Sequence, residues 1–237
     1  MDQNNQKALS TSQQLIISKF LSKTYGWMMV GLLITALTSL VISQNENLLQ
    51  MILGNKFVFY AIMIAEFATV LLLSMLAPRL SAMMLAFGFM FYSFLNGLTF
   101  SVIFLIYTAS SITNVFFLTS AMFGGLALFG MITKKDMGPI GTFVGMGLWG
   151  IIILSIINIF VGSEHLSMGI SLAGVFVFSG LTAYESQKIK MMAFAASTGN
   201  GNTDIVEKGA LFSALTMYLN FINLFLSLLR LMGTRRD

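Results

Sequence analysis

Residues 209–232 read GALFSALTMYLNFINLFLSLLRLM, and this stretch decides the fold of the chain. It is long and apolar enough to cross the hydrocarbon core of a bilayer, which takes about 20 helical residues. Asn220 and Asn223 lie three positions apart, so they share one face of the helix. Polar side chains in hydrocarbon are stable only where neighbouring helices supply hydrogen-bond partners. The stretch is therefore expected to lie inside a bundle of membrane helices.

The composition of the whole chain is that of a membrane protein. Of its 237 residues, 57% are hydrophobic and 9% are charged, and the mean hydropathy is +0.85. A soluble domain has about a quarter charged residues. The basic residues stand singly or in pairs between apolar runs, a pattern that suits topology determinants and indicates no nucleic-acid partner. Cysteine is absent and His165 is the single histidine, so neither residue type can form a metal cluster.

Seven apolar stretches of span length follow one another along the chain, and they predict an all-α, seven-transmembrane helix bundle in a lipid bilayer. The expected spans are Tyr25–Ser43, Phe57–Ala77, Leu80–Tyr107, Ile112–Ile132, Pro139–Val161, Ser167–Tyr184 and a last span from about Ile205 to Met232. Residues 1–24 are polar and then weakly amphipathic, which predicts a polar N-terminal segment with a short interfacial helix. Residues 25–233 form the transmembrane domain and residues 234–237 a basic tail.

The basic residues that flank the spans predict the orientation. With the N-terminus in the cytoplasm, nine Lys and Arg residues lie inside and four lie outside, which agrees with the positive-inside rule. The inner residues are Lys7, Lys19, Lys23, Arg79, Lys134, Lys135, Lys188, Lys190 and Lys208, and the outer residues are Lys56, Arg230, Arg235 and Arg236. We therefore expect a multi-pass protein of the plasma (inner) membrane. The outer arginines leave a re-entrant last segment as the alternative, although its length favours a full crossing.

Ionisable groups within the spans point to function, because each costs about 2.5–3.5 kcal/mol at mid-helix unless it is paired or hydrated. Glu66 lies about 13 Å into the second span, and it is either functional or a protonated acid hydrogen-bonded in the core. Glu185 and Arg79 close their spans at the same expected membrane face, so the sequence predicts an ion pair between them. The alternative is that both are solvated interfacial charges. Asn96 and Asn223 are secondary candidates, or simply hydrogen-bond neighbouring helices.

Three runs in this chain resemble the Bax inhibitor-1 family of membrane proteins, also called the TMBIM family. They are TKKDMGPIGTF at 133–143, SGLTAYESQKIK at 179–190 and ALTMYLNFINLFLSLLRL at 214–231. The resemblance covers nearly the whole chain from Lys23 to Gly233 and includes NGLTFS at 96–101. It implies a bundle of helices around a central last helix and a calcium leak controlled by pH.

The resemblance also implies which residues control that leak. In the family, control is attributed to two aspartates and to an arginine latch at the end of the second span, and these positions correspond here to Glu185, Asn220 and Arg79. The chain departs from the pattern because Asn220 cannot ionise, so two carboxylates that share a proton cannot form at this site. Glu185 and Asn220 remain candidate weak calcium ligands, since hard cations accept carboxylate and amide oxygens alike.

Two functions from different classes follow from these residues. The first is a weak, pH-sensitive calcium leak channel, with calcium as the transported ion and no cofactor. The second is a non-conducting regulator of a membrane protease or of a cell-stress pathway, with that protease as a partner. An enzyme is not favoured, because the residues supply no nucleophile–base pair, phosphate-binding loop or metal cluster.

Overall fold

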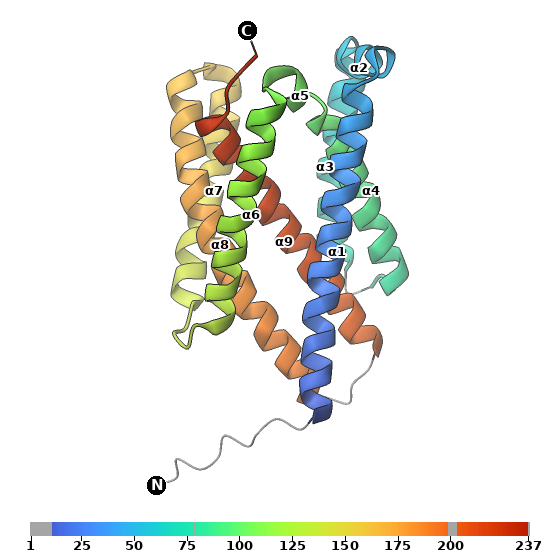
Figure 1. Ribbon diagram of the computed structural model, residues 1–237, viewed down its shortest axis with the longest axis vertical. Coiled ribbons are helices and arrows are strands. Elements are labelled where there is room, and N and C mark those ends of the chain that lie inside the picture. Colours follow the sequence, from blue (N-terminus) through green and yellow to red (C-terminus); the bar gives the residue numbers. More distant parts are fainter. Residues whose placement is uncertain (1–10, 78, 199–202, 237) are drawn as a thin grey trace.

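The computed structural model describes residues 11–77, 79–198 and 203–236. The start of the polar N-terminal segment, Pro78, residues 199–202 and Asp237 at the tip of the basic tail lie outside the described residues. Seven of the described helices are long and apolar enough to cross a membrane, which confirms the predicted seven-span bundle (Figure 1). The helices are α1 Thr11–Ser43, α2 Glu46–Leu53, α3 Lys56–Leu76, α4 Ala82–Phe100, α5 Ile103–Ile106, α6 Ala109–Ile132, α7 Gly138–Val161, α8 Glu164–Thr198 and α9 Thr203–Met232.

Two of these helices are longer than their apolar stretches. Helix α1 begins at Thr11 and continues without a break into the first span, so the amphipathic residues before Tyr25 form the first part of one helix. Helix α8 extends beyond Tyr184 to Thr198. Buried side chains at helical spacing line this extension: Ser186, Ile189, Ala193 and Ser197. Packing against the bundle therefore continues α8 past the end of its apolar run.

Two connections also differ from the sequence prediction. The connection between the first two expected spans contains a further helix, α2, and Asn45 caps its first turn by accepting a hydrogen bond from the Leu48 amide at 3.2 Å. The third expected span divides into α4 and the short α5. At the break, the Ser101 hydroxyl donates to the Leu98 carbonyl at 2.6 Å, which competes with the regular helical hydrogen bonds.

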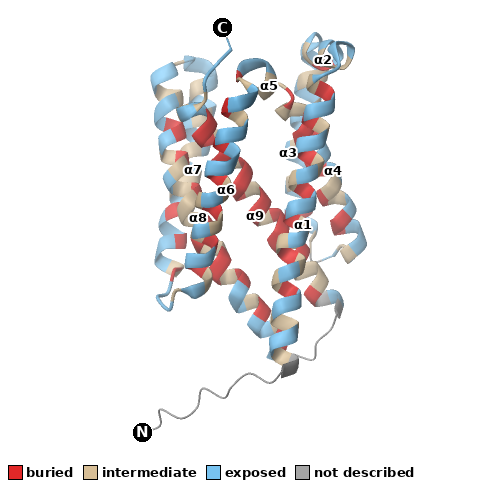
Figure 2. Ribbon diagram, viewed as in Figure 1, coloured by how far each residue is buried: buried red, intermediate tan, exposed pale blue. Residues whose placement is uncertain are grey.

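Helix α9 is the most buried of the seven spans. In its most apolar window, 72% of the residues are buried, compared with 6% for α3 and for α7. Helix α9 packs against α1, α4, α6 and α8, and it crosses the bundle obliquely (Figures 1 and 2). It is one continuous helix of 30 residues, about 45 Å long at 1.5 Å per residue. A continuous helix of this length is expected to cross the bilayer fully, whereas a re-entrant segment would have to turn back within the membrane.

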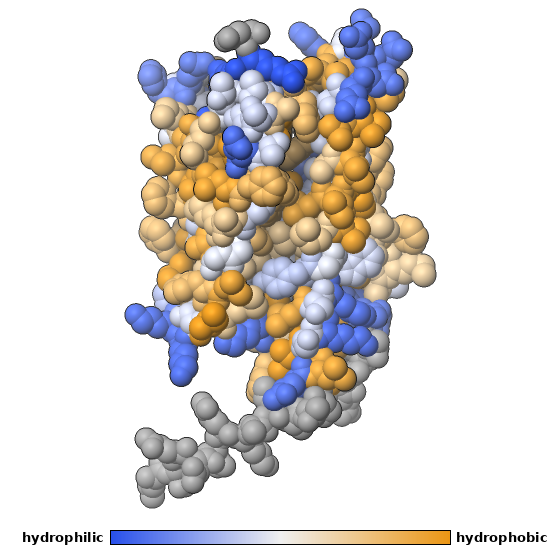
Figure 3. All heavy atoms as spheres, in the orientation of Figure 1, coloured by the Kyte–Doolittle hydropathy of each residue, from blue (hydrophilic) through white to orange (hydrophobic). Residues whose placement is uncertain are grey.

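The surface of the bundle suits a bilayer. Hydrophilic residues gather at its two ends, and a broad apolar band lies between them (Figure 3). Large side chains on α7 point out of this band: Phe143, Trp149 and Phe160 are 73%, 68% and 85% exposed. Such side chains require a hydrocarbon environment, which identifies the chain as a multi-pass membrane protein.

Glycines set how closely the neighbouring helices approach α8. A Cβ on Gly141 of α7 would lie 2.5 Å from the Tyr184 ring, and one on Gly174 of α8 would lie 2.5 Å from the Ser227 hydroxyl of α9. A Cβ on Gly130 of α6 would overlap the carbonyl group of Ala183. Only glycine permits these contacts, so α6, α7 and α9 all pack tightly around the middle of α8.

Candidate functional site

A cavity of about 800 Å³ lies between α3, α7, α8 and α9, and we call it the glutamate cavity. Its polar lining residues are Ser155, Ser171, Glu185, Thr216, Asn220, Asn223, Ser227 and Arg230. The cavity therefore brings together three residues that the sequence singled out: Glu185, Asn220 and Asn223. Arg79, Glu66 and Asn96 do not line it.

Helix α9 presents one polar stripe to the glutamate cavity. Its residues follow one another at intervals of four and three positions, which keeps them on one helical face: Thr216, Asn220, Asn223, Ser227 and Arg230. The Asn223 amide donates to the Leu219 carbonyl at 2.8 Å, and the Ser227 hydroxyl donates to the Asn223 carbonyl at 2.7 Å. The Asn220 side chain is 6% exposed, and its Nδ2 has no hydrogen-bond partner within the described residues. Asn220 thus keeps an unused amide at the cavity wall.

Glu185 is the acidic residue among the described residues that line the glutamate cavity. Its side chain is 14% exposed, and its Oε2 lies 3.4 Å from Nζ of Lys188, one turn further along α8. Lys188 is 43% exposed, so this ion pair is weak and can open. The lining of the glutamate cavity thus includes one carboxylate and two carboxamides, the kinds of oxygen ligand that hard cations bind.

The loop between α6 and α7 fixes the segment of α8 that carries Glu185. Gln187 accepts a hydrogen bond from the Met137 amide at 2.9 Å and donates one to the Lys135 carbonyl at 2.8 Å. Lys190 donates to the Met131 carbonyl at 2.6 Å. Two of the three runs that carry the family resemblance therefore meet here, and their contacts hold α8 in register with α6 and α7.

A second cavity of about 690 Å³ adjoins the first, and we call it the arginine cavity. The two cavities share Ser155, Ile159, Ile170 and Arg230 as lining residues. The arginine cavity continues toward the end of the bundle where α9 ends, and its further lining residues are Ile106, Tyr107, Asn158, Ser167 and Arg235. The two cavities together lead from that end of the bundle to Glu185.

Arg230 stands where the two cavities meet, and sequence reasoning missed this role. The sequence suggested Arg230 only as a topology determinant. A usable signal was present, because Arg230 follows Asn223 by seven positions and therefore lies on the same helical face.

The predicted ion pair between Arg79 and Glu185 is wrong for this structure. Arg79 is exposed in the turn after α3, and no acidic group of the described residues lies within 4 Å of its guanidinium. Lys188 is the cation beside Glu185. Helix α3 packs chiefly against α4 and reaches the glutamate cavity with Phe67 and Val70, whereas Arg79 follows in the turn after α3 and does not line that cavity. A shared depth in the membrane did not make these two residues neighbours.

Glu66 and Asn96 belong to a separate polar cluster, formed by α1, α3, α4 and α9. Glu66 accepts a hydrogen bond from the Thr99 hydroxyl at 3.4 Å, and Asn96 is 3% exposed. The Tyr218 hydroxyl lies 2.6 Å from the Thr35 hydroxyl, deep between α9 and α1. The Glu66–Thr99 hydrogen bond joins α3 to α4 and the Thr35–Tyr218 hydrogen bond joins α1 to α9, as expected for polar residues at helix interfaces, whereas Nδ2 of Asn96 has no hydrogen-bond partner within the described residues.

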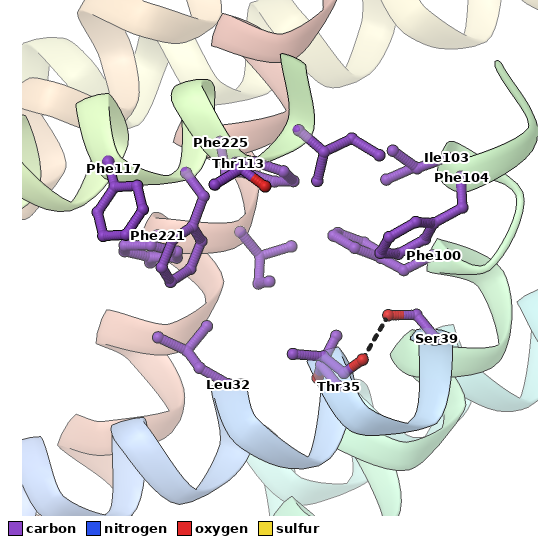
Figure 4. A pocket seen from close by; sticks show the side chains of 14 residues that line it. Leu32, Thr35, Ser39, Phe100, Ile103, Phe104, Thr113, Phe117, Phe221 and Phe225 are labelled. Atoms are coloured by element: carbon purple, nitrogen blue, oxygen red, sulfur yellow. Dashed lines mark hydrogen bonds between the residues drawn. The ribbon is translucent and has the colours of Figure 1, made fainter. Parts of the chain in front are cut away.

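A third cavity of about 290 Å³ lies between α1, α4, α5, α6 and α9, and its wall is mainly apolar (Figure 4). Its phenylalanines are Phe100, Phe104, Phe116, Phe117, Phe221 and Phe225. The hydroxyls of Ser39 and Thr113 already donate to backbone carbonyls of their own helices, at 3.0 and 2.9 Å. This cavity therefore offers little to an ion, and the glutamate cavity remains the candidate site.

Comparison with known proteins places this geometry in a family. Residues 17–237 match the family described as "Inhibitor of apoptosis-promoting Bax1". The chain is 40% identical over 220 residues to the "Inner membrane protein YbhL" of Escherichia coli, covering 93% of each chain. It is 40% identical over 223 residues to an uncharacterized protein of Borreliella burgdorferi, covering 94% of this chain and 95% of the other. An uncharacterized protein of Deinococcus radiodurans is 36% identical over 239 residues and covers 100% of both.

Proposed function

The chain belongs to the Bax inhibitor-1 family, and on that premise we propose that it is a weak, pH-sensitive calcium leak channel. The observation that carries the proposal is that Glu185 and Asn220, the positions of the family's two control residues, line one cavity. That cavity adjoins a second one that leads to the end of the bundle. The transported ion is calcium, and the activity requires no cofactor.

In the proposed mechanism, Glu185 is the gate. When Glu185 is ionised and Lys188 turns away, a partly hydrated calcium ion exchanges water for the carboxylate and for the amide oxygens of Asn220 and Asn223. Protonation of Glu185 removes the charge that attracts the ion, and conduction falls. Arg230 repels cations where the two cavities meet, so conduction is slow and the activity is a leak.

We further propose that the chain lies in the inner membrane with its N-terminus in the cytoplasm. The Escherichia coli relative is named an inner membrane protein, which supports this location, and the count of basic residues supports the orientation. The arginine cavity then opens on the outer side.

Calcium efflux from liposomes tests the proposal. Purified protein should release calcium faster than protein-free liposomes do. Glu185→Gln should reduce the rate about tenfold or more at neutral pH and flatten its pH dependence, because it removes a negative charge whose attraction for a cation about 4 Å away is about 4 kcal/mol near a protein surface, and each 1.4 kcal/mol is about tenfold. Glu46→Gln is the matched control, since Glu46 is exposed on α2, away from both cavities, and it should behave like the unsubstituted protein.

Efflux no faster than from protein-free liposomes would refute conduction. Copurification of a membrane protease would then favour the second function, a non-conducting regulator.

A further inference from the structure

The arginine cavity carries positive charge that the protein itself does not neutralise. Arg230 and Arg235 both line it, and its described lining residues include no carboxylate. Arg230 has no acidic group within 4 Å among the described residues. Arg235 lies 3.7 Å from Glu164, but these side chains are 68% and 90% exposed, and exposed pairs hold weakly. Both guanidinium groups are therefore available to an anion.

The neutral groups of the arginine cavity are also hydrogen-bond donors. Asn158 uses its Oδ1 to accept from the Ser163 amide at 3.0 Å, and its Nδ2 donates to the Ser167 hydroxyl oxygen at 2.7 Å. The Ser167 hydroxyl hydrogen and the second hydrogen of the Asn158 amide remain to be donated. A cavity that offers donors and cations is complementary to an anion and not to a metal ion.

The backbone holds Arg235 in place above the cavity. The residues on either side of it are bound to the turn between α5 and α6: the Thr108 amide donates to the Thr234 carbonyl at 3.1 Å, and the Arg236 amide donates to the Ile106 carbonyl at 2.8 Å. The Thr234 amide donates to the Ser111 hydroxyl at 2.9 Å. We call residues 234–236 the C-terminal strap. Because the strap and the last turn of α9 fix the backbone at both arginines in advance, only their side chains remain to be ordered when an anion binds.

We propose that the arginine cavity binds a phosphate group, carried either by a phospholipid headgroup or by a free phosphate. The planar guanidinium fork matches phosphate oxygens and donates two hydrogen bonds at once. Both arginines lie at the ends of membrane spans, where lipid headgroups lie, and basic pockets between membrane helices bind such headgroups. The proposal concerns binding and does not depend on whether the protein conducts calcium.

Binding is tested on delipidated protein in a maltoside detergent that contains no phosphate. The protein is titrated separately with short-chain phosphatidylglycerol, with inorganic phosphate and with sodium chloride at equal ionic strength, and the shift of its unfolding temperature is measured. A shift with phosphatidylglycerol alone identifies a lipid headgroup, and a shift with both phosphates identifies the phosphate group itself as sufficient. If neither compound stabilises the protein more than chloride does, the proposal is overturned.

Charge-matched variants locate the site. Arg235→Gln and Arg236→Gln remove the same charge from adjacent exposed residues, but only Arg235 lines the cavity. We expect Arg230→Gln and Arg235→Gln to raise the half-saturating concentration of the phosphate compound that stabilises the protein about tenfold or more, since each removes charge-assisted hydrogen bonds. Arg236→Gln should leave it unchanged. If Arg235→Gln and Arg236→Gln weaken binding equally, the anion is attracted by the general positive charge, and the assignment to this cavity is overturned.

Discussion

Gly130→Ala tests the closest approach of α6 to α8. A Cβ at this position would overlap the Ala183 carbonyl oxygen and would lie 2.9 Å from its carbon and 3.0 Å from the Ser186 Cβ. The carbonyl belongs to the backbone and cannot rotate away, so α6 and α8 must separate. Overpacking costs about 1–3 kcal/mol, and we expect the rigid neighbour to place this substitution near the upper end of that range.

Gly124→Ala is the matched control, because it lies on the same helix and its added Cβ would meet nothing within 4 Å. Both substitutions gain the same helix propensity, about 1 kcal/mol. The difference between the two variants therefore isolates the clash. A difference of about 3 kcal/mol corresponds to a gap of roughly 6–12 °C between their unfolding midpoints, at about 2–4 °C per kcal/mol for a chain of this size.

The assay is thermal unfolding in detergent, followed by the fluorescence of Trp27 and Trp149. We expect Gly124→Ala to match or exceed the stability of the unsubstituted protein and Gly130→Ala to fall well below it. Equal midpoints for the two variants would refute the packing of α6 on α8 that positions Glu185.

Three further predictions concern the candidate site and the topology. Arg79→Ala should change the free energy of unfolding by less than about 0.5 kcal/mol, as for other exposed residues without a partner. If thermal unfolding shows that the variant is less stable by several kcal/mol, the ion pair between Arg79 and Glu185 would be supported after all. Asn220→Asp places a second carboxylate at the glutamate cavity, and repulsion between the two acids should move the pH dependence of calcium efflux toward neutral pH; an unchanged profile would contradict the proposed gate. A cysteine introduced at Ser163 should react with a membrane-impermeant maleimide from outside, and one at Lys135 only from the cytoplasmic side; labelling of Lys135→Cys alone from outside would reverse the proposed orientation, and labelling of both from outside would contradict the crossing of α7 between them.

The spans could be predicted from the sequence because the thickness of the bilayer fixes the length of an apolar helix. The ends of α3, α6 and α7 lie within a few residues of the prediction for this reason. The extension of α8 to Thr198 could not be predicted in this way, since it depends on burial of residues such as Ala193 against other helices. Local hydropathy does not record such contacts.

In the candidate site, too, some features could be predicted from the sequence and others depend on how the helices pack. Glu185 and Asn220 lie on one cavity, as their positions in two family-like motifs suggested. Arg79 was wrongly paired because hydropathy gives the depth of a residue in the membrane, whereas the packing of α3 against α4 decides its lateral position. The arginine cavity combines residues from α5, α7, α8, α9 and the C-terminal strap. No pattern within one helix could have indicated it.

The most buried of the seven spans follows the other six along the chain, so it is synthesised after them. When a ribosome has inserted the first six spans, the helices that will surround α9 still lack the partner against which α1, α4, α6 and α8 bury their inner faces. Polar groups such as the Thr35 hydroxyl, which meets Tyr218, then face lipid or one another. The first six spans can therefore pack fully only after α9 has been inserted, and a truncation before residue 203 removes the helix that fills their interior.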